Sequence, residues 1–225
     1  MQDKETVKID MSNSNSDIYD RQKRIHDFDQ SALSQGNVLI IGAGALGNEC
    51  TKNLCQAGIG RMTLVDFDNI EVSNLNRCVW YTHDDIGSPK AIVLKDKLSS
   101  QFTDISINAI TQRFEDMDEQ LLIDADVVVS CVDSMDTRLT INSYCMDFSI
   151  PLVDGGTEAF SGRVQTVIPG TTPCLECGRR DVKQKIMNAR YRCGELVDVF
   201  ERSTAAISTC PTAASSILRA SSTGI

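Results

Sequence analysis

Continuous apolar runs alternate with longer amphipathic stretches along most of this chain. Runs rich in Val, Ile and Leu predict strands at residues 38–41, 62–65, 105–110, 127–131, 152–154 and 163–168. Helix-like stretches occupy residues 46–57, 90–101, 115–123 and 137–148, and a charged, helix-prone segment at 19–35 precedes the first strand. Strands that are apolar throughout and separated by helices are typical of a parallel sheet covered on both faces.

The last two predicted strands break this alternation. Residues 152–168 contain no helix-like stretch, and Gly155-Gly156 and Ser161-Gly162 are turn signals. We therefore expect an α/β fold with a mostly parallel sheet, helices on both faces and an antiparallel C-terminal extension.

A glycine-rich turn follows the first predicted strand, in the pattern Gly42-x-Gly44-x-x-Gly47. Gly42 makes the tight turn, Gly44 lets the backbone approach a phosphate, and Gly47 lets the next helix pack on the strand. The N-terminus of that helix then directs free N–H groups at an anion. Asp66 ends the second strand, where a carboxylate binds a ribose hydroxyl. These features predict a Rossmann-like fold that binds a nucleotide.

Polar and cationic residues after Asp66 indicate which nucleotide is bound. Asn74 and Arg77 lie in the segment Ser73-Asn-Leu-Asn-Arg77, and Lys90 follows in Gly87-Ser-Pro-Lys90. A nicotinamide cofactor carries two phosphates and needs an apolar floor for its ring, whereas these three groups suit a triphosphate. Arg and Lys neutralise the charge that moves onto pyrophosphate when the α-phosphorus is attacked.

Asp133 comes just after the apolar run at 127–131. A carboxylate at the C-terminal end of a parallel strand lies in the ligand crevice. The alternative is that Asp133 caps the following helix, although Asp136 is closer to its expected start.

Composition narrows the class of protein. The chain has 225 residues, 41% hydrophobic and 24% charged, with a net charge of −9 that argues against nucleic acid as a partner. No apolar run approaches the roughly 20 residues of a membrane span. Residues 1–17 are polar and read as a disordered tail. The chain has 9 cysteines, an odd number, and no signal peptide is recognisable at its N-terminus. Both observations favour reduced thiols in a cytoplasmic protein.

These motifs together resemble the adenylation domain of the ubiquitin-activating enzymes and their bacterial relatives, the ThiF-type and molybdopterin-synthase adenylyltransferases. The matching pieces are Tyr19-Asp-Arg-Gln22, Gly42-x-Gly-x-x-Gly47, Asp66-Phe-Asp68, Ser73-Asn-Leu-Asn-Arg77, Gly87-x-Pro-Lys90, Cys131-x-Asp133, Arg138 and Cys174-x-x-Cys177. The resemblance covers about residues 18–215 and implies an ATP-binding adenylation domain over residues 18–225.

The resemblance implies an activity and partners. Such enzymes use ATP and Mg²⁺ to adenylate the C-terminal glycine of a ubiquitin-like protein, and then pass the acyl group to a thiol or a sulfur donor. The partners expected are that protein, a second copy of this chain in a homodimer, and a conjugating enzyme or sulfurtransferase. Asp133 would hold Mg²⁺ beside the phosphates, and Arg21 would reach the ATP of the opposite subunit. The alternative for Arg21 is a solvated helix arginine.

The Cys174-x-x-Cys177 pair has the spacing of half a tetrahedral zinc site. A redox dithiol is the alternative, although such a motif normally opens a helix directly after a strand. The family supplies a second pair further on, so either that pair lies beyond residue 225 or Cys193 and Cys210 complete the site. We expect a missing C-terminal portion, because the chain stops within a helix-like run at 212–220.

Residues 169–208 have little apolar periodicity and are expected to cross the surface. Cys210 directly precedes Pro211, where a helix can begin and lower the pKa of a thiol. We therefore note Cys210 as a candidate thioester nucleophile, with Cys193 second. A structural thiol remains the alternative for both.

Two other functions stay open. An NAD-dependent oxidoreductase fits the glycine turn and Asp66 alone. An inactive partner subunit that only binds a ubiquitin-like protein would not need Arg77, Lys90 and Asp133 together.

Overall fold

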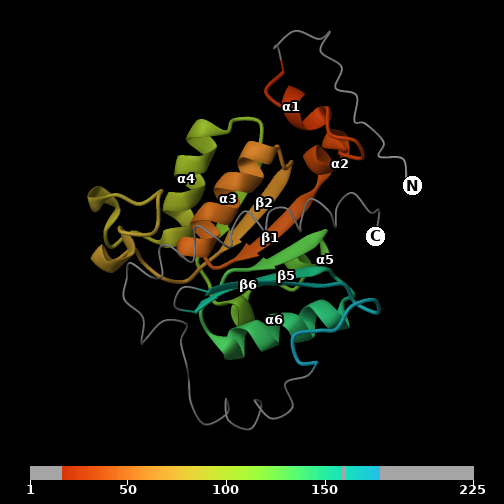
Figure 1. The fold of residues 1–225 in the computed structure, drawn as a ribbon. Coiled ribbons are helices and arrows are strands. Elements are labelled where there is room, and N and C mark those ends of the chain that lie inside the picture. The colour runs from red at the N-terminus through yellow and green to blue at the C-terminus, as the bar shows by residue number, and fades with distance from the viewer. Residues whose placement is uncertain (1–16, 159–160, 178–225) are drawn as a thin grey trace.

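The computed structural model describes residues 17–158 and 161–177 (Figure 1). Several expectations therefore concern residues outside the described ranges. They are residues 1–16 of the tail expected at 1–17, most of the crossing segment, Cys193, Cys210 and the helix-like run at 212–220. Within the described part of the chain, no helix has both the length and the apolar character needed to cross a membrane.

A single 6-stranded sheet forms the centre of the fold, in the order β3-β2-β1-β4-β5-β6. Its strands are β1 (Asn37–Ile41), β2 (Arg61–Val65), β3 (Ser106–Ile110), β4 (Val127–Ser130), β5 (Leu152–Glu158) and β6 (Ser161–Val167). The neighbours from β3 to β5 pair in parallel, and only β5 and β6 pair antiparallel. This arrangement confirms the predicted Rossmann-like sheet with an antiparallel extension.

Helices cover both faces of the sheet. They are α1 (Asp20–Lys23), α2 (Gln30–Gln35), α3 (Ala45–Ala57), α4 (Lys90–Gln101), α5 (Gln120–Ile123) and α6 (Met135–Asp147), with short 3-10 turns η1 (Val72–Asn74), η2 (His83–Asp85) and η3 (Phe114–Asp116). Figure 1 shows α3 and α4 together beside β1 and β2, and α6 on the other side of the sheet. The sheet is thus the middle layer of three.

Strand β1 shows how the sequence produces these layers. Successive side chains of a strand point to opposite faces. Val38 and Ile40 accordingly join the hydrophobic cluster that holds the helices α3 and α4, whereas Leu39 and Ile41 join the cluster on the side of α6. All four are buried, which explains why the strand is apolar at every position rather than alternating.

The helix expected at 19–35 is wrong as a continuous element. Two short helices, α1 and α2, replace it, and Asp27 between them has a φ of 64°. Asp29 then caps α2 by accepting hydrogen bonds from the backbone N–H groups of Ser31 and Ala32. A residue in the left-handed region followed by a capping aspartate stops one helix and starts another.

The helix expected at 115–123 is also shorter than predicted. Its first part is the 3-10 turn η3, and only α5 is α-helical. Asp118 separates the two by accepting a 3.0 Å hydrogen bond from the backbone N–H of Gln120. Such a local side-chain bond competes with the helical hydrogen bonds of the backbone.

Two glutamines fasten the N-terminal helices to the end of α3. The amide nitrogens of Gln22 and Gln30 donate to the carbonyl oxygen of Ala57, at 2.7 Å and 3.1 Å. Ala57 is the last residue of α3, which runs away from the carboxyl ends of the strands. The α1 segment is therefore held at the opposite end of the sheet from the glycine turn (Figure 1).

Candidate nucleotide-binding site

A cavity of about 600 Å³ lies at the carboxyl ends of the parallel strands. Residues at or just after the ends of β1, β2, β3 and β4 form its walls, as expected for an open α/β sheet. The candidates Gly42, Gly44, Asp66, Asn74, Arg77, Lys90 and Asp133 all line this cavity. The structure therefore brings together the residues that the sequence analysis assigned to nucleotide binding, apart from Gly47 and Arg21.

The glycines of the turn have different reasons for lacking a side chain. Gly42 has a φ of 99°, and a Cβ there would lie 2.7 Å from the carbonyl oxygen of Cys131. A Cβ on Gly47 would collide with the carbonyl oxygen of Gly42, so Gly47 lets α3 pack on the turn. Gly44 precedes α3, and a Cβ there would meet no atom within 4 Å. Gly44 is thus the glycine whose surroundings leave room for a ligand.

Asp66 is fixed by the backbone around it. One carboxylate oxygen accepts a 2.6 Å hydrogen bond from the N–H of Ala43, and the other accepts a 2.8 Å bond from the N–H of Asp68. Burial raises the pKa of Asp66, while the nearby charge of Lys90 and the two backbone bonds oppose that rise. The carboxyl group is therefore locked to the glycine turn at the edge of the cavity.

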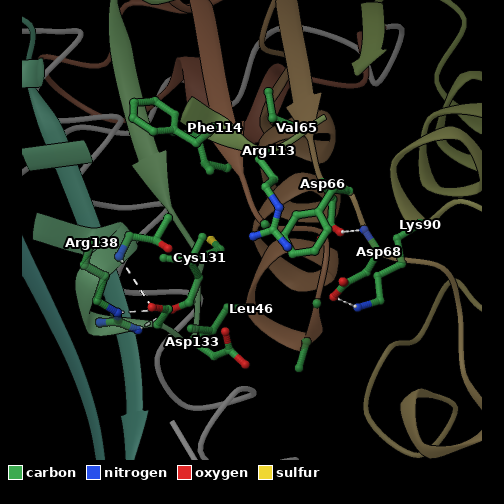
Figure 2. A pocket seen from close by; sticks show the side chains of 18 of the residues that line it. Leu46, Val65, Asp66, Asp68, Lys90, Arg113, Phe114, Cys131, Asp133 and Arg138 are labelled. Carbon is green, nitrogen blue, oxygen red and sulfur yellow. Dashed lines mark hydrogen bonds and ion pairs between the residues drawn. The ribbon is translucent and has the colours of Figure 1, made fainter. Parts of the chain in front are cut away.

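Lys90 begins α4 and forms an ion pair across the cavity wall. Its Nζ lies 2.8 Å from Oδ2 of Asp68, and its backbone N–H donates to the carbonyl oxygen of Asp68 at 2.9 Å. The Lys90 side chain is only 11% exposed. Figure 2 shows Asp66, Asp68 and Lys90 on one side of the cavity.

Asn74 and Arg77 belong to the loop that begins at η1. Asn74 is buried, and its Oδ1 accepts a 3.0 Å hydrogen bond from the N–H of Glu71. Glu71 and Asn74 form a reciprocal capping box, so the Asn74 amide shapes the loop as well as lining the cavity. The Arg77 guanidinium donates to the carbonyl oxygen of Ser73 and to Oδ1 of Asn76. These bonds hold the cation close to its own loop.

Asp133 lies in the segment between β4 and α6 and lines the cavity, but it does not cap α6. The N-cap is Ser134, whose side chain accepts from the N–H of Thr137 at 3.5 Å. Asp136 lies in the first helical turn, so its expected role as the cap is wrong. Ser has the short side chain that reaches back to the first turn from an extended cap position. The carboxylate of Asp133 is consequently not used as a cap.

Arg138 holds the segment that carries Asp133. Its Nε and Nη2 donate to the carbonyl oxygen of Val132 at 3.1 Å and 2.6 Å, and its Nη1 pairs with Asp154. Figure 2 shows the Arg138 side chain next to Asp133. The sequence analysis noted Arg138 as part of the family pattern without a role, and the structure supplies this one.

One pair in the cavity was missed by the sequence analysis. The guanidinium carbon of Arg113 lies 4.1 Å from the centre of the Phe67 ring, in cation–π geometry. Phe67 follows β2 and Arg113 follows β3, and both line the cavity. The positions of Phe67 and Arg113 in the sequence could have indicated this pair, because side chains just after parallel strands share one edge of the sheet.

Cys174 and Cys177 lie side by side. Their sulfur atoms are 3.5 Å apart, and the segment is anchored to α6 where the N–H of Leu175 donates to Asn142. Burial raises the pKa of Cys174, but hydrogen bonds from the backbone of Glu176 and from Cys177 outweigh it, and the net shift is downward. Among the residues that the structure describes, no three His, Cys, Asp or Glu side chains form a group that could hold a metal.

Known proteins similar to this chain in sequence include a subunit of an activating enzyme and an adenylyltransferase. The NEDD8-activating enzyme E1 catalytic subunit of Arabidopsis thaliana is 35% identical over 153 residues, covering 62% of this chain and 34% of the relative. The sulfur carrier protein ThiS adenylyltransferase of Escherichia coli is 33% identical over 177 residues, covering 76% of this chain and 70% of the relative. The chain thus spans about a third of the Arabidopsis protein and most of the bacterial one.

Solved structures of E. coli MccB share the fold. The complex with ATP has a TM-score of 0.70 and 28% sequence identity, covering 86% of this chain and 58% of MccB. The complex with succinimide has a TM-score of 0.78 and 26% identity, covering 94% of this chain and 65% of MccB.

A family model agrees with these similarities. The model of the ThiF family matches residues 19–218, which include every residue of the cavity. The chain therefore belongs to the ThiF family.

Proposed function

We propose that this chain is an ATP-dependent activating enzyme that adenylates the C-terminal glycine of a ubiquitin-like protein. One observation carries the proposal: a single cavity collects the ribose carboxylate candidate Asp66, the cations Arg77 and Lys90, and the carboxylate Asp133. The E. coli ThiS adenylyltransferase and the Arabidopsis NEDD8-activating subunit are named for activities of this kind.

In this reaction a carboxylate oxygen of the partner protein attacks the α-phosphorus of ATP. A new O–P bond forms, the bond between the α-phosphorus and the oxygen that bridges to the β-phosphorus breaks, and pyrophosphate leaves with the electron pair. The nucleophile is already an anion at neutral pH, so no general base is required. Positioning and charge neutralisation perform the catalysis.

The cavity residues divide these tasks. Asp66, locked by the N–H groups of Ala43 and Asp68, accepts hydrogen bonds from the ribose hydroxyls. Arg77 and Lys90 neutralise the charge that develops on the departing pyrophosphate. The Lys90 ammonium has three donor hydrogens, so it can contact a phosphate in addition to Asp68.

Asp133 is the residue proposed to hold Mg²⁺. Mg²⁺ binds one or two carboxylates together with substrate phosphates, and Asp133 supplies a carboxylate that does not cap a helix. When bound, the ion would screen the phosphate charge.

Cys174 and Cys177 are proposed as half of a structural zinc site. The 3.5 Å distance between their sulfur atoms and the lowered pKa of Cys174 suit a thiolate pair. The remaining ligands would come from outside the described residues, where Cys193 and Cys210 lie. Metal analysis of the protein tests this site, and a protein free of zinc would reject it.

Further partners follow from the same proposal. The acyl-adenylate would pass to a thiol, with Cys210 as the first candidate, or to a sulfurtransferase or conjugating enzyme. A homodimer is proposed because Arg21 is exposed and lies outside the cavity of its own chain. The cysteine usage favours a cytoplasmic setting.

Pyrophosphate exchange into ATP, measured with candidate ubiquitin-like proteins, tests the proposal. The chain should exchange only with a partner that has a C-terminal glycine, and Arg77→Ala should reduce the rate by about 10²-fold. Arg61→Ala is a matched control, because Arg61 is an exposed residue at the start of β2, away from the cavity. If none of the candidate partners supported exchange, adenylation would be rejected.

A binding measurement separates the alternatives. ATP with Mg²⁺ should raise the melting temperature and NAD should not, because stabilisation follows differential binding to the folded state. Stabilisation by NAD and not by ATP would favour the oxidoreductase. A chain that binds a ubiquitin-like protein but no ATP would favour the inactive partner subunit.

A further inference from the structure

The buried hydroxyl of Tyr81 joins two segments of the cavity wall. It lies 2.7 Å from the carbonyl oxygen of Ala43 in the glycine turn and 3.2 Å from that of Lys90 at the start of α4. Tyr81 is 4% exposed, and burial raises its pKa, so the hydroxyl keeps its proton. That one proton is shared between the two carbonyl oxygens, with the closer one, of Ala43, as its principal acceptor. Tyr81 itself lies behind the wall rather than in it.

Asn48 ties the same turn to the loop that carries Arg77. Its Nδ2 donates to the carbonyl oxygens of Ala43 and Gly44 at 2.9 Å and 3.1 Å, and its Oδ1 accepts from the N–H of Trp80 at 3.1 Å. Asn48 has no exposed surface. Trp80 directly precedes Tyr81. Two adjacent residues of one loop are therefore tied to the glycine turn, Trp80 through Asn48 and Tyr81 through its own hydroxyl.

The hydrogen bonds of Tyr81, Asn48 and Asp66 meet at the backbone of Ala43. Its carbonyl oxygen accepts from Asn48 and Tyr81, while its N–H donates to the Asp66 carboxylate. The ribose carboxylate candidate, the glycine turn and the start of α4 therefore share one buried network. Bonds in such a network support one another, and its geometry is more sharply defined than that of separate pairs.

We propose that Tyr81 is a positioning residue for the triphosphate, because its hydroxyl sets the spacing between the glycine turn and Lys90. This inference rests on the proposed ATP site. Lys90 is the first residue of α4, so the reach of its ammonium toward a phosphate depends on where the start of α4 is held. Loss of the hydroxyl leaves the carbonyl oxygen of Ala43 with Asn48 as a donor and removes the hydrogen bond to the carbonyl oxygen of Lys90.

A positioning role for Tyr81 makes a prediction that a packing role does not. If Tyr81 only filled space, its hydroxyl would not distinguish ligands that reach Lys90 from those that do not. If it positions Lys90, its removal weakens binding of a triphosphate and spares adenosine, which has no phosphate for Lys90 to contact.

Calorimetric titration of the whole chain with ATP and Mg²⁺, and with adenosine, tests this. Tyr81→Phe keeps the ring and should weaken ATP binding about tenfold, while the affinity for adenosine changes less than about twofold. Tyr144→Phe is the matched control, because Tyr144 on α6 does not line the cavity and packs its ring against Phe114 and Phe148. Equal losses for ATP and adenosine would overturn the inference.

A double-mutant cycle tests whether Tyr81 affects ATP binding through Lys90. In a Lys90→Ala background, Tyr81→Phe should change ATP affinity by less than about twofold, since the group that it positions is gone. An undiminished tenfold effect in that background would reject the inference. Both measurements use binding, so a chain that binds ATP without exchange rejects the proposed function while still deciding the role of Tyr81. A chain that binds no ATP rejects both.

Discussion

Arg138 and Asp154 form an ion pair beneath the cavity, with 3.1 Å between Nη1 and Oδ2 and side-chain exposures of 4% and 0%. Ser130 donates to the other carboxylate oxygen of Asp154 at 2.9 Å, so the buried anion is well satisfied. The guanidinium also donates twice to the carbonyl oxygen of Val132, the residue before Asp133. One arginine therefore links the centre of the sheet to the segment that carries the proposed Mg²⁺ ligand.

Removing this arginine should be costly. Arg138→Met leaves the Asp154 carboxylate without its closest cation in the interior, and breaking a buried pair in this way typically costs about 3–5 kcal/mol. The expected result is a loss of that size in the free energy of unfolding, measured by urea denaturation. Variants that remain folded should also need more Mg²⁺ for pyrophosphate exchange, because the Asp133 segment loses its anchor.

Arg163→Met is the matched control for Arg138. Arg163 also approaches Asp154, but at 3.6 Å and with 43% of its side chain exposed. An exposed pair contributes about 0–1 kcal/mol, so this variant should unfold almost like the parent. Equal losses from both substitutions would contradict the assignment of Arg138 as the principal partner.

Two glycines of the turn should respond differently to the same substitution. Gly47→Ala places a methyl group against the carbonyl oxygen of Gly42, and overpacking against backbone should lower the free energy of unfolding by about 3 kcal/mol. Gly44→Ala meets no atom within 4 Å, so its effect on stability should stay below about 1 kcal/mol. Its methyl group should nevertheless weaken ATP binding by occupying space beside the cavity.

Urea denaturation and ATP titration of both variants check this difference. The proposed approach of a phosphate to Gly44 would be wrong if Gly44→Ala bound ATP as tightly as the parent. The packing role of Gly47 would be wrong if Gly47→Ala were as stable as the parent.

Asp66 should give stability an unusual dependence on pH. Burial raises its folded pKa above the ordinary value of 3.8, so the folded state binds the proton more tightly than the unfolded state. The stabilisation from this group is complete below pH 3.8 and is lost as the pH rises through the raised folded pKa. Asp66→Asn should therefore gain stability relative to the parent as the pH rises across that window.

Asp29 provides a control of opposite sign. Hydrogen bonds from the backbone of Ala32 and from Ser31 lower its pKa below 3.8. Its stabilisation is present above pH 3.8 and is lost as the pH falls through the lowered folded pKa. Denaturation series for Asp66→Asn and Asp29→Asn should slope in opposite directions against the parent, and parallel slopes would contradict the burial effect at Asp66.

The sequence predicted the parts of this molecule that depend on local pattern. Each strand followed from an apolar run, and the cavity residues followed from their places just after parallel strands, where Asp66 and Asp133 lie. The contacts that connect those residues were not predictable in this way. Arg113 on Phe67 and Arg138 on Asp154 depend on how separate strands and helices come together.

The short helices show the same limit at a smaller scale. Periodicity at 19–35 and 115–123 suggested continuous helices, but Asp29 and Asp118 formed local hydrogen bonds with the backbone and interrupted them. Aspartate is compatible with a helix surface in a pattern, and only its actual partner decides between a cap, a turn and a helical position.

Arg21 supports the last prediction, which concerns the proposed homodimer. Gln22 fastens α1 to the far end of α3, and Arg21 is exposed there, outside the cavity of its own chain. If Arg21 completes the site of the partner, Arg21→Ala and Asp133→Ala chains should each be inactive alone. Mixed and allowed to exchange subunits, they should recover about a quarter of the parent's activity, because about half of the dimers are mixed and each has one intact site of two.

The control for this mixing experiment is the neighbouring cation. Arg24, which caps the C-terminal end of α1, pairs with Asp20 at 2.8 Å, so Arg24→Ala should leave pyrophosphate exchange close to that of the parent. Subunit exchange has to be verified with differently tagged chains. Verified mixed dimers without recovered activity would reject a trans role for Arg21, since each such dimer contains one site with every proposed residue present.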